Sequence, residues 1–381
     1  MTERIKSTRI ILEDKIISGY VYFSDGLIIA VTDEELPFDI EKNFGDLYIS
    51  PGFVDIHTHG GGGYDFKDGA EAVICAANTH LRHGTTSILP TLSAAPIESI
   101  KKSLDQIREA KSSDVLKANL IGAHVEGPYF NPEYCGAQNT SYITPPISEE
   151  YIPLLSEYSD VIKRISYAPE LDTGNTFLRE MRKYGIVASA GHTGARYSDM
   201  ERAISDGLNL VTHLYSCTST VTREGGFRFP GVIETALLRD DLYAEIIADG
   251  KHLPYELIRL VVKAKGRDRV ALITDSLYPA GIESDIACDD FIIEDGVCKL
   301  PDRSAFAGSI CLSDRCVREV VLGAGLPIED AIYMISTVPC RIIGLNKGSL
   351  KSGFDADIVA FDNEINVKSV IVAGKEVYTR E

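Results

Sequence analysis

Histidines and carboxylates recur at the ends of short apolar runs in this chain. In the first such run, His57 and His59 lie two residues apart, and on a strand this spacing puts both imidazoles on one face. A lone His-Thr-His pair is more often structural than metal-binding. Six such residues at the ends of apolar runs would rarely arise by chance. Together they are a typical ligand set for Zn²⁺, with water completing the coordination. The six are His57, His59, Glu126, His192, His213 and Asp275.

The middle of the chain contains eight apolar runs of strand length, and these must position the six residues. The runs cover 54–57, 86–89, 120–125, 165–168, 187–190, 210–213, 245–248 and 270–274. Amphipathic stretches such as 70–82, 97–110, 175–184 and 254–264 separate them, and two more at 312–322 and 328–335 follow. Strands alternating with helices predict an α/β fold of the (β/α)8, TIM-barrel type. The strand ends of such a barrel converge on one mouth, so we expect the six residues to meet there.

Both ends of the chain have a different pattern. The first fifty residues contain short strand-like segments at 9–12, 15–23 and 27–32, and the last thirty contain others at 357–361, 367–372 and 376–378. The sequence therefore predicts a small β-sandwich-like domain built from residues 1–50 and 345–381. The barrel would then occupy residues 51–344.

Composition narrows the classes of partner. The formal net charge of −18 disfavours nucleic acid and anionic membranes, and it requires a local basic pocket for any anionic ligand. We find no apolar segment typical of a signal peptide or a membrane span. The eight cysteines form no Cys-x-x-Cys pair, which is typical of reduced thiols in a cytoplasmic protein.

Several longer motifs carry a family resemblance. They are PGFVDIHTHG (51–60), HGTTSILPTL (83–92), HVEGPYFNPEYCGAQ (124–138), GHTGARYSDM (191–200), THLYS (212–216), TRE (222–224), IIADGKH (246–252), LITDS (272–276), AGS (307–309) and KGSLKSGFDADIVAFD (347–362). They occur in order and cover the barrel. In this combination they resemble the N-acetylglucosamine-6-phosphate deacetylase family of the amidohydrolase superfamily.

The resemblance implies a role for each matching residue. Glu126, His192 and His213 match the main metal ligands, His57 and His59 match a pair that completes a second metal site in some members, and Asp275 matches the catalytic aspartate. Arg223 and His252 match residues that hold the sugar phosphate across a dimer interface. The resemblance thus implies a homodimer with one or two divalent ions. We expect Zn²⁺, with Fe²⁺, Co²⁺ or Mn²⁺ as alternatives.

Three departures from the family pattern surround this set. The chain has Ser216-Cys217 where the family usually has Asn-Ala, and Gln138 where it usually has a histidine that polarises the acetyl carbonyl. The segment 225–229 is longer than the usual turn. We expect backbone N–H groups near Ser216 and Cys217 to bind phosphate, and we expect Gln138 to stabilise the oxyanion together with the metal.

These features predict a metal-dependent deacetylase that converts N-acetylglucosamine-6-phosphate to glucosamine-6-phosphate and acetate. The departures leave other substrates open: N-acetylgalactosamine-6-phosphate, an unphosphorylated N-acetyl sugar or, more distantly, an N-acylated amino acid. A catalytically idle sugar-phosphate sensor is an alternative from a different class. Retention of Asp275 argues against a sensor, which has no need of a general base.

Overall fold

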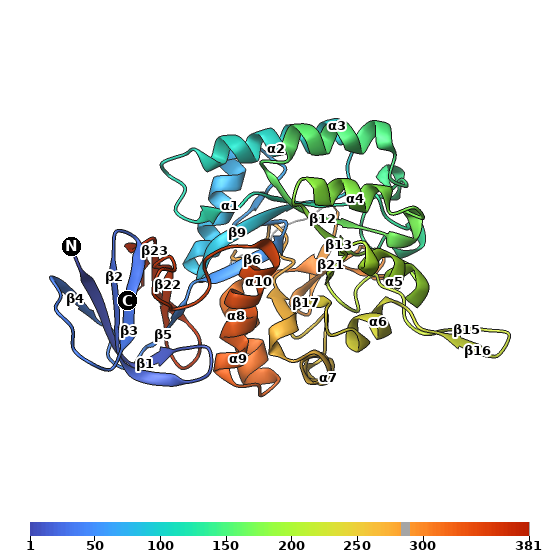
Figure 1. The fold of residues 1–381 in the computed structure, drawn as a ribbon. Helices are drawn as coiled ribbons and strands as arrows, with labels where there is room; N and C mark the ends of the chain where they lie inside the picture. Colours follow the sequence, from blue (N-terminus) through green and yellow to red (C-terminus); the bar gives the residue numbers. More distant parts are fainter. Residues whose placement is uncertain (283–289, 381) are drawn as a thin grey trace.

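The computed structural model describes residues 1–282 and 290–380. Within these residues eight parallel strands form the nearly closed barrel that the sequence predicts (Figure 1). The strands are β6 (Phe53–Thr58), β9 (Thr85–Leu92), β11 (Ala123–Glu126), β12 (Ile162–Tyr167), β13 (Val187–Ala190), β14 (Leu210–Val211), β17 (Tyr243–Ile247) and β18 (Val270–Ile273). The short β10 (Asn119–Leu120) precedes β11 and pairs with β9.

The barrel closes between its last strand and its first. The backbone N–H of Asp275 donates to the carbonyl of His57 at 2.9 Å, and the N–H of His59 donates to the carbonyl of Ser276 at 2.8 Å. These hydrogen bonds lie at the carboxyl ends of β18 and β6. Residues distant in the sequence thus become neighbours at the barrel mouth, where the sequence predicts the metal ligands.

Helices cover the outside of the barrel (Figure 1). They are α1 (Ala70–Arg82), α2 (Ile97–Lys111), α3 (Ser148–Tyr158), α4 (Thr176–Lys183), α5 (Tyr197–Ser205), α6 (Val232–Leu238), α7 (Tyr255–Lys265), α8 (Ser313–Arg318), α9 (Ile328–Ile332) and α10 (Val338–Ile343). Helix α1 shows why they form: Val73, Ala76, Ala77 and Leu81 make one apolar stripe, which is buried. The barrel strands beneath are buried on both faces, and this holds for the polar as well as the apolar residues of β6 and β9.

The structure extends the last predicted helix. Helix α9 continues through a π-helical turn (Tyr333–Thr337) into α10, well past residue 335 where the amphipathic pattern stops. Most residues of this extension are buried, so it lacks the polar face that marks a surface helix. The amphipathic pattern therefore could not predict it.

Both termini contribute to one mixed, eight-stranded sheet. Its strands are β1 (Glu3–Ile11), β2 (Ile16–Ser24), β3 (Leu27–Thr32), β4 (Ile40–Asn43), β5 (Tyr48–Pro51), β22 (Ile358–Phe361), β23 (Val367–Val372) and β24 (Lys375–Thr379). Antiparallel pairing of β5 with β22 joins the two ends, which Figure 1 shows as blue and red strands side by side. The sheet has its own apolar cluster, which includes Ile10, Val21 and Ile358. The exact domain boundaries at 50/51 and 344/345 stay a prediction.

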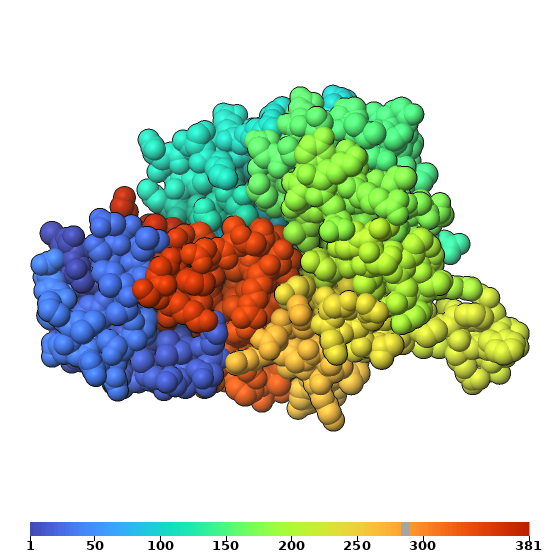
Figure 2. Space-filling view, viewed as in Figure 1, coloured from blue at the N-terminus to red at the C-terminus, as the bar shows by residue number. Residues whose placement is uncertain are grey.

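Several short strands lie outside the barrel and the small-domain sheet. They are β7 (Gly60–Gly61), β8 (Tyr64–Asp65), β15 (Thr222–Glu224), β16 (Phe227–Phe229), β19 (Ile292–Glu294), β20 (Val297–Lys299) and β21 (Phe306–Ser309). The β15–β16 hairpin projects from the body of the molecule (Figures 1 and 2). The helices in the described ranges are all too short or too polar to cross a membrane.

Candidate metal centre

The six residues expected at the barrel mouth do meet there. His57 lies on β6 and Glu126 is the last residue of β11, whereas His59, His192, His213 and Asp275 stand just beyond the ends of β6, β13, β14 and β18. All six are buried. The convergence follows from the barrel, because parallel strands bring their carboxyl ends to one face.

Glu126 occupies the centre of the cluster. Its Oε1 lies 3.3 Å from Nε2 of His57, 3.2 Å from Nε2 of His192 and 3.1 Å from Nε2 of His213. Its Oε2 lies 3.3 Å from Nε2 of His59. One carboxylate therefore contacts four imidazoles, and its two oxygens face different members of the set.

Asp275 forms the second focus of the cluster. Its Oδ1 lies 3.4 Å from Nε2 of His57 and 3.2 Å from Nε2 of His59. Two groups of donor atoms consequently lie close enough to hold a metal ion, and His57 belongs to both. The groups are His57, His59 and Asp275, and His57, Glu126 and His213.

The spacing of these atoms fits a bound cation. A tetrahedral ion with bonds of about 2.0–2.1 Å places neighbouring ligand atoms about 3.3 Å apart. The separations between Nε2 and carboxylate oxygen atoms in the cluster run from 3.1 to 3.4 Å. In addition, Nε2 of His57 is buried and has no hydrogen-bond partner among the described residues. Such a polar atom is costly to bury unless something binds it.

In three of these histidines the other ring nitrogen, Nδ1, faces an oxygen atom outside the cluster. Nδ1 of His59 lies 3.1 Å from Oγ of Ser93. Nδ1 of His192 and Nδ1 of His213 each lie 3.1 Å from a backbone carbonyl, those of Tyr134 and Ser216. When Nδ1 donates to such an oxygen, the lone pair of Nε2 is left for a metal.

The backbone is strained where three of these residues leave their strands. His192, His213 and Asp275 have φ angles of 48°, 27° and 46°, in the left-handed region that non-glycine residues avoid. Each such residue costs on the order of 1–3 kcal/mol and persists only where its surroundings enforce it. At each of these three positions the chain leaves the strand direction, and the side chain joins the cluster at the barrel mouth.

The electrostatics of the cluster keep its carboxylates charged. Burial alone would raise the pKa of Glu126, but His57, His192 and His213 hold it well below its usual range. Burial likewise opposes ionisation of Asp275, yet His57 and His59 lower its pKa. Charged carboxylates among imidazoles suit a divalent cation, which displaces protons from its ligands on binding.

Gln138 lies against the central carboxylate. Its Nε2 donates to Oε2 of Glu126 at 2.9 Å, and its Oε1 accepts from the backbone N–H of Ala94 at 2.9 Å. The Ala94 bond sets the orientation of the amide, so that the NH₂ group faces the cluster. Gln138 is therefore beside the candidate metal atoms, at a place where it can donate to a ligand.

His124 is a hydrogen-bonded core histidine. Its ring nitrogens lie 3.1 Å from Oγ1 of Thr91 and 2.8 Å from Oγ of Ser166. Burial and the nearby charge of Arg164 lower its pKa well below the usual value. The ring packs edge-on against His57, with centroids 4.7 Å apart, and thereby supports that ligand sterically.

The expected phosphate-binding residues are more dispersed. Ser216 and Cys217 are adjacent to the cluster, and the Cys217 carbonyl accepts from the N–H of Thr193 at 3.0 Å. Nδ1 of His252 lies 2.8 Å from Oδ2 of Asp249, and its side chain is nearly buried. Arg223 is exposed on the projecting β15–β16 hairpin, so this chain alone does not bring it to its own metal cluster.

The sequence analysis did not identify two charged residues that lie beneath the cluster. Arg164 on β12 and Glu245 on β17 are both fully buried and pair with each other inside the barrel. Glu245 Oε2 also lies 3.5 Å from Nδ1 of His57. For Glu245 the available signal was one charged residue in an otherwise apolar strand, YAEII, which has few explanations other than a buried partner. The strand of Arg164, IKRISY, contains other polar residues and gave no such signal.

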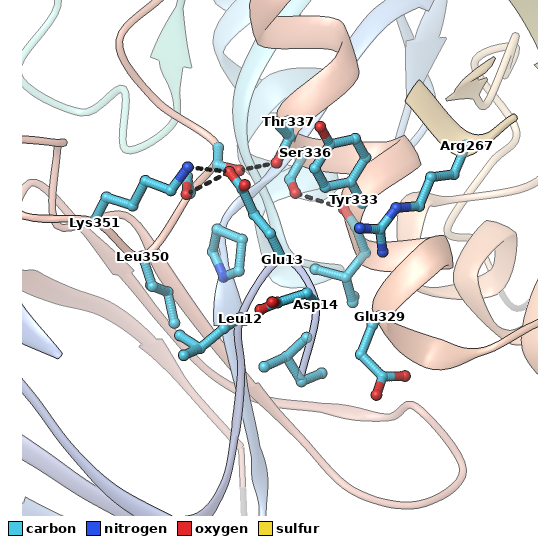
Figure 3. A pocket seen from close by; sticks show the side chains of 15 residues that line it. Leu12, Glu13, Asp14, Arg267, Glu329, Tyr333, Ser336, Thr337, Leu350 and Lys351 are labelled. Atoms are coloured by element: carbon cyan, nitrogen blue, oxygen red, sulfur yellow. Dashed lines mark hydrogen bonds and ion pairs between the residues drawn. The ribbon is translucent and has the colours of Figure 1, made fainter. Parts of the chain in front are cut away.

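A separate cavity of about 320 Å³ lies between the small domain and the barrel (Figure 3). Leu12, Glu13 and Lys351 line one side, and Arg267 and Tyr333 line the other. Two of its charged residues form ion pairs with acidic side chains: Nζ of Lys351 lies 2.6 Å from Oε1 of Glu13, and Nη1 of Arg267 lies 2.8 Å from Oδ1 of Asp330. The residues that line it do not overlap with the metal cluster, so the candidate chemistry is elsewhere.

Known proteins resemble the chain along nearly its whole length. The amidohydrolase family pattern matches residues 48–377. The N-acetylglucosamine-6-phosphate deacetylase of Bacillus subtilis is 32% identical, over 97% of this chain and 96% of its own. The N-acetylgalactosamine-6-phosphate deacetylase of Escherichia coli O157:H7 is 27% identical, over 98% of this chain and 99% of its own.

A solved structure of a similar protein also matches this chain along nearly its whole length. It is a mutant N-acetyl-D-glucosamine-6-phosphate deacetylase of Mycobacterium smegmatis in complex with N-acetyl-D-glucosamine-6-phosphate. It superposes with a TM-score of 0.91 at 26% identity and covers 99% of this chain and 100% of its own. With the barrel, the histidine–carboxylate cluster and these relatives in agreement, the chain belongs to the N-acetylglucosamine-6-phosphate deacetylase family within the amidohydrolases.

Proposed function

We propose that this chain hydrolyses the acetamide of N-acetylglucosamine-6-phosphate to give glucosamine-6-phosphate and acetate. The observation that carries the proposal is the cluster around Glu126, with Asp275 beside it at the barrel mouth. The relative from Bacillus subtilis, which is named for this reaction, supports the choice of substrate. A cytoplasmic setting remains a prediction from composition.

The proposed cofactor is a divalent metal, with Zn²⁺ as the expected ion. Donor spacing and ligand type support one ion at His57, His59 and Asp275. We propose the second ion at Glu126, His192 and His213, where Oε1 of Glu126 lies 3.2 Å and 3.1 Å from Nε2 of the two histidines. The two oxygens of Glu126 face both sets, which would let it bridge them. When bound, the metal lowers the pKa of water to about 7 and polarises the acetyl carbonyl.

Side chains of this protein carry out the proton transfers and stabilise the developing negative charge. Asp275 accepts the proton of the attacking water and then passes it to the departing amine, so one carboxyl acts first as base and then as acid. The side-chain N–H of Gln138 donates to the oxygen of the acetyl group as negative charge develops there. To do so it exchanges its hydrogen bond with Glu126 for one with the substrate.

We propose that the substrate phosphate is bound by cations from a second subunit. Arg223 is suited to this role because its guanidinium can form two parallel hydrogen bonds with a phosphate. Its position on an exposed, projecting hairpin supports contact with a neighbouring chain rather than with its own mouth. His252, also supplied by the second subunit, and the backbone near Ser216 and Cys217 would complete the phosphate site.

N-acetylgalactosamine-6-phosphate is a second candidate substrate. The relative in Escherichia coli O157:H7 that is named for this reaction matches almost the whole chain. Gln138 and Ser216-Cys217, which depart from the usual family residues, lie beside the cluster where they can affect the choice of sugar.

Acetate release from a panel of N-acetyl sugars tests the function. We expect the metal-loaded protein to act on N-acetylglucosamine-6-phosphate with a higher kcat/KM than on its galactosamine isomer or on unphosphorylated N-acetylglucosamine. Equal kcat/KM with and without the phosphate would contradict the phosphate site. No acetate from any member of the panel would contradict the deacetylase.

The ligand set predicts the metal content. Protein saturated with Zn²⁺ should hold two ions per chain, measured by elemental analysis after gel filtration. His213→Ala should lose most of the bound metal and the activity, because it removes a ligand of the cluster. A folded His213→Ala protein with full metal content and turnover would remove this residue from the site.

Asp275→Asn tests the proton transfer. The amide has the same size but cannot accept a proton, so kcat should fall by about 10²- to 10⁴-fold. Substrate binding should persist, which calorimetric titration of the inactive variant can show. A near-normal kcat would mean that another group is the base.

Arg223→Ala tests the phosphate contact. Loss of a charge-assisted hydrogen bond of about 1.5–3 kcal/mol should raise KM for the phosphorylated substrate by about 10- to 100-fold. Arg228→Ala is a matched control, because Arg228 lies opposite Arg223 on the same hairpin. If both variants change KM equally, the effect belongs to the hairpin rather than to Arg223.

A further inference from the structure

A buried ion pair lies inside the barrel, directly beneath the metal cluster. Arg164 on β12 and Glu245 on β17 are both fully buried. The guanidinium donates to both carboxylate oxygens, from Nη1 to Oε1 and from Nη2 to Oε2, the latter at 2.6 Å. Arg164 also donates to the carbonyl of Ile56 at 3.2 Å and to Oγ1 of Thr212 at 3.0 Å. These bonds hold the carboxylate of Glu245 in one orientation.

Stability alone is a poor reason for charges at this place. Two charges removed from water lose their hydration, and a well-packed apolar pair of similar volume often stabilises a core as much or more. The barrel interior around them already contains apolar side chains such as Ile56, Leu210 and Ile247. The pair therefore calls for an explanation in terms of what the carboxylate faces.

Glu245 faces His57. Its Oε2 lies 3.5 Å from Nδ1 of that ring, which has no closer hydrogen-bond partner among the described residues. His57 differs in this from the other three histidines of the cluster. Their Nδ1 atoms face uncharged oxygens, those of Ser93, Tyr134 and Ser216. A carboxylate behind an imidazole fixes the tautomer and makes the opposite nitrogen a stronger metal ligand.

His57 is also the residue that the two candidate metal groups share. Its Nε2 lies 3.3 Å from Oε1 of Glu126 and 3.4 Å from Oδ1 of Asp275. A rotation of this ring would therefore disturb both groups together. His124 limits the ring from one side by edge-on packing, and Glu245 is the polar group that can set its orientation.

We propose that Glu245, held by Arg164, is a positioning residue that keeps Nδ1 of His57 protonated and directs Nε2 into the metal cluster. The proposal rests on the metal-dependent function above and extends it to residues that neither touch substrate nor bind metal. Its consequence is metal affinity. Loss of the carboxylate should weaken binding of the metal that His57 holds, while substrate recognition is retained.

Glu245→Gln is the direct test. The substitution keeps the shape of the side chain and removes its charge. We expect the Kd for Zn²⁺, measured on metal-free protein by competition with a chromophoric chelator, to rise by about 10- to 100-fold. The visible spectrum of the Co²⁺-loaded protein should also change, because the ligand field around the ion changes. At saturating metal, KM should stay that of the wild type.

A matched control separates positioning from general loosening of the barrel. Ser189→Ala removes another buried contact of Arg164, the bond from Nη2 to Oγ of Ser189 at 3.3 Å, and leaves Glu245 in place. We expect wild-type Zn²⁺ affinity in this variant, even if its thermal stability falls. If Ser189→Ala weakens Zn²⁺ binding as much as Glu245→Gln, the proposal is wrong.

A second variant covers the case in which Glu245→Gln fails to fold because Arg164 is left unpaired. Arg164→Met with Glu245→Leu removes both charges and fills their volume. If this folded double variant binds Zn²⁺ as tightly as the wild type, the proposal is overturned. Metal titration needs no substrate, so the result stands apart from the deacetylase assay. A wild-type protein that binds Zn²⁺ but releases no acetate would contradict only the proposed function.

Discussion

The carboxylate of Glu126 lies among four imidazole rings at the barrel mouth, and the arrangement of the mouth depends on it. A buried anion is stable only where positive charge or hydrogen-bond donors compensate for its lost hydration. Here His57, His59, His192 and His213 all turn Nε2 toward it at 3.1–3.3 Å. The same inward orientation makes these atoms available to a cation. Compensation of one charge and preparation of a metal site are thus the same geometric requirement.

Short strands and irregular turns satisfy this requirement together. Strand β14 contains only Leu210 and Val211, and His213 follows it in a left-handed conformation. The turn that strains His213 also brings the carbonyl of Ser216 against its Nδ1. Local strain is therefore offset by a hydrogen bond that orients the ring. The loops beyond the strands, not the strands alone, determine the directions of the ligands.

The residues that depart from the family pattern surround the cluster rather than belong to it. Gln138 donates to Glu126, and Ser216 supports His213 through a backbone carbonyl that many residue types could provide. An amide at position 138 keeps a hydrogen-bond donor beside Glu126 but, unlike an imidazole, it cannot carry a charge.

The sequence by itself determined the barrel, the small domain built from both ends of the chain and the six residues that meet at the barrel mouth. Each depends on a local pattern: apolar runs of strand length, amphipathic helices, and polar residues at successive strand ends, which every parallel barrel brings together. The chain order could not reveal that Arg164 reaches Glu245 and that Glu245 faces His57. Nor could it show that Ala94 orients Gln138, or that the hairpin carrying Arg223 projects from the body of the molecule. These contacts join residues that share no local pattern, and only the closure of the barrel and the paths of its loops bring them within bonding distance.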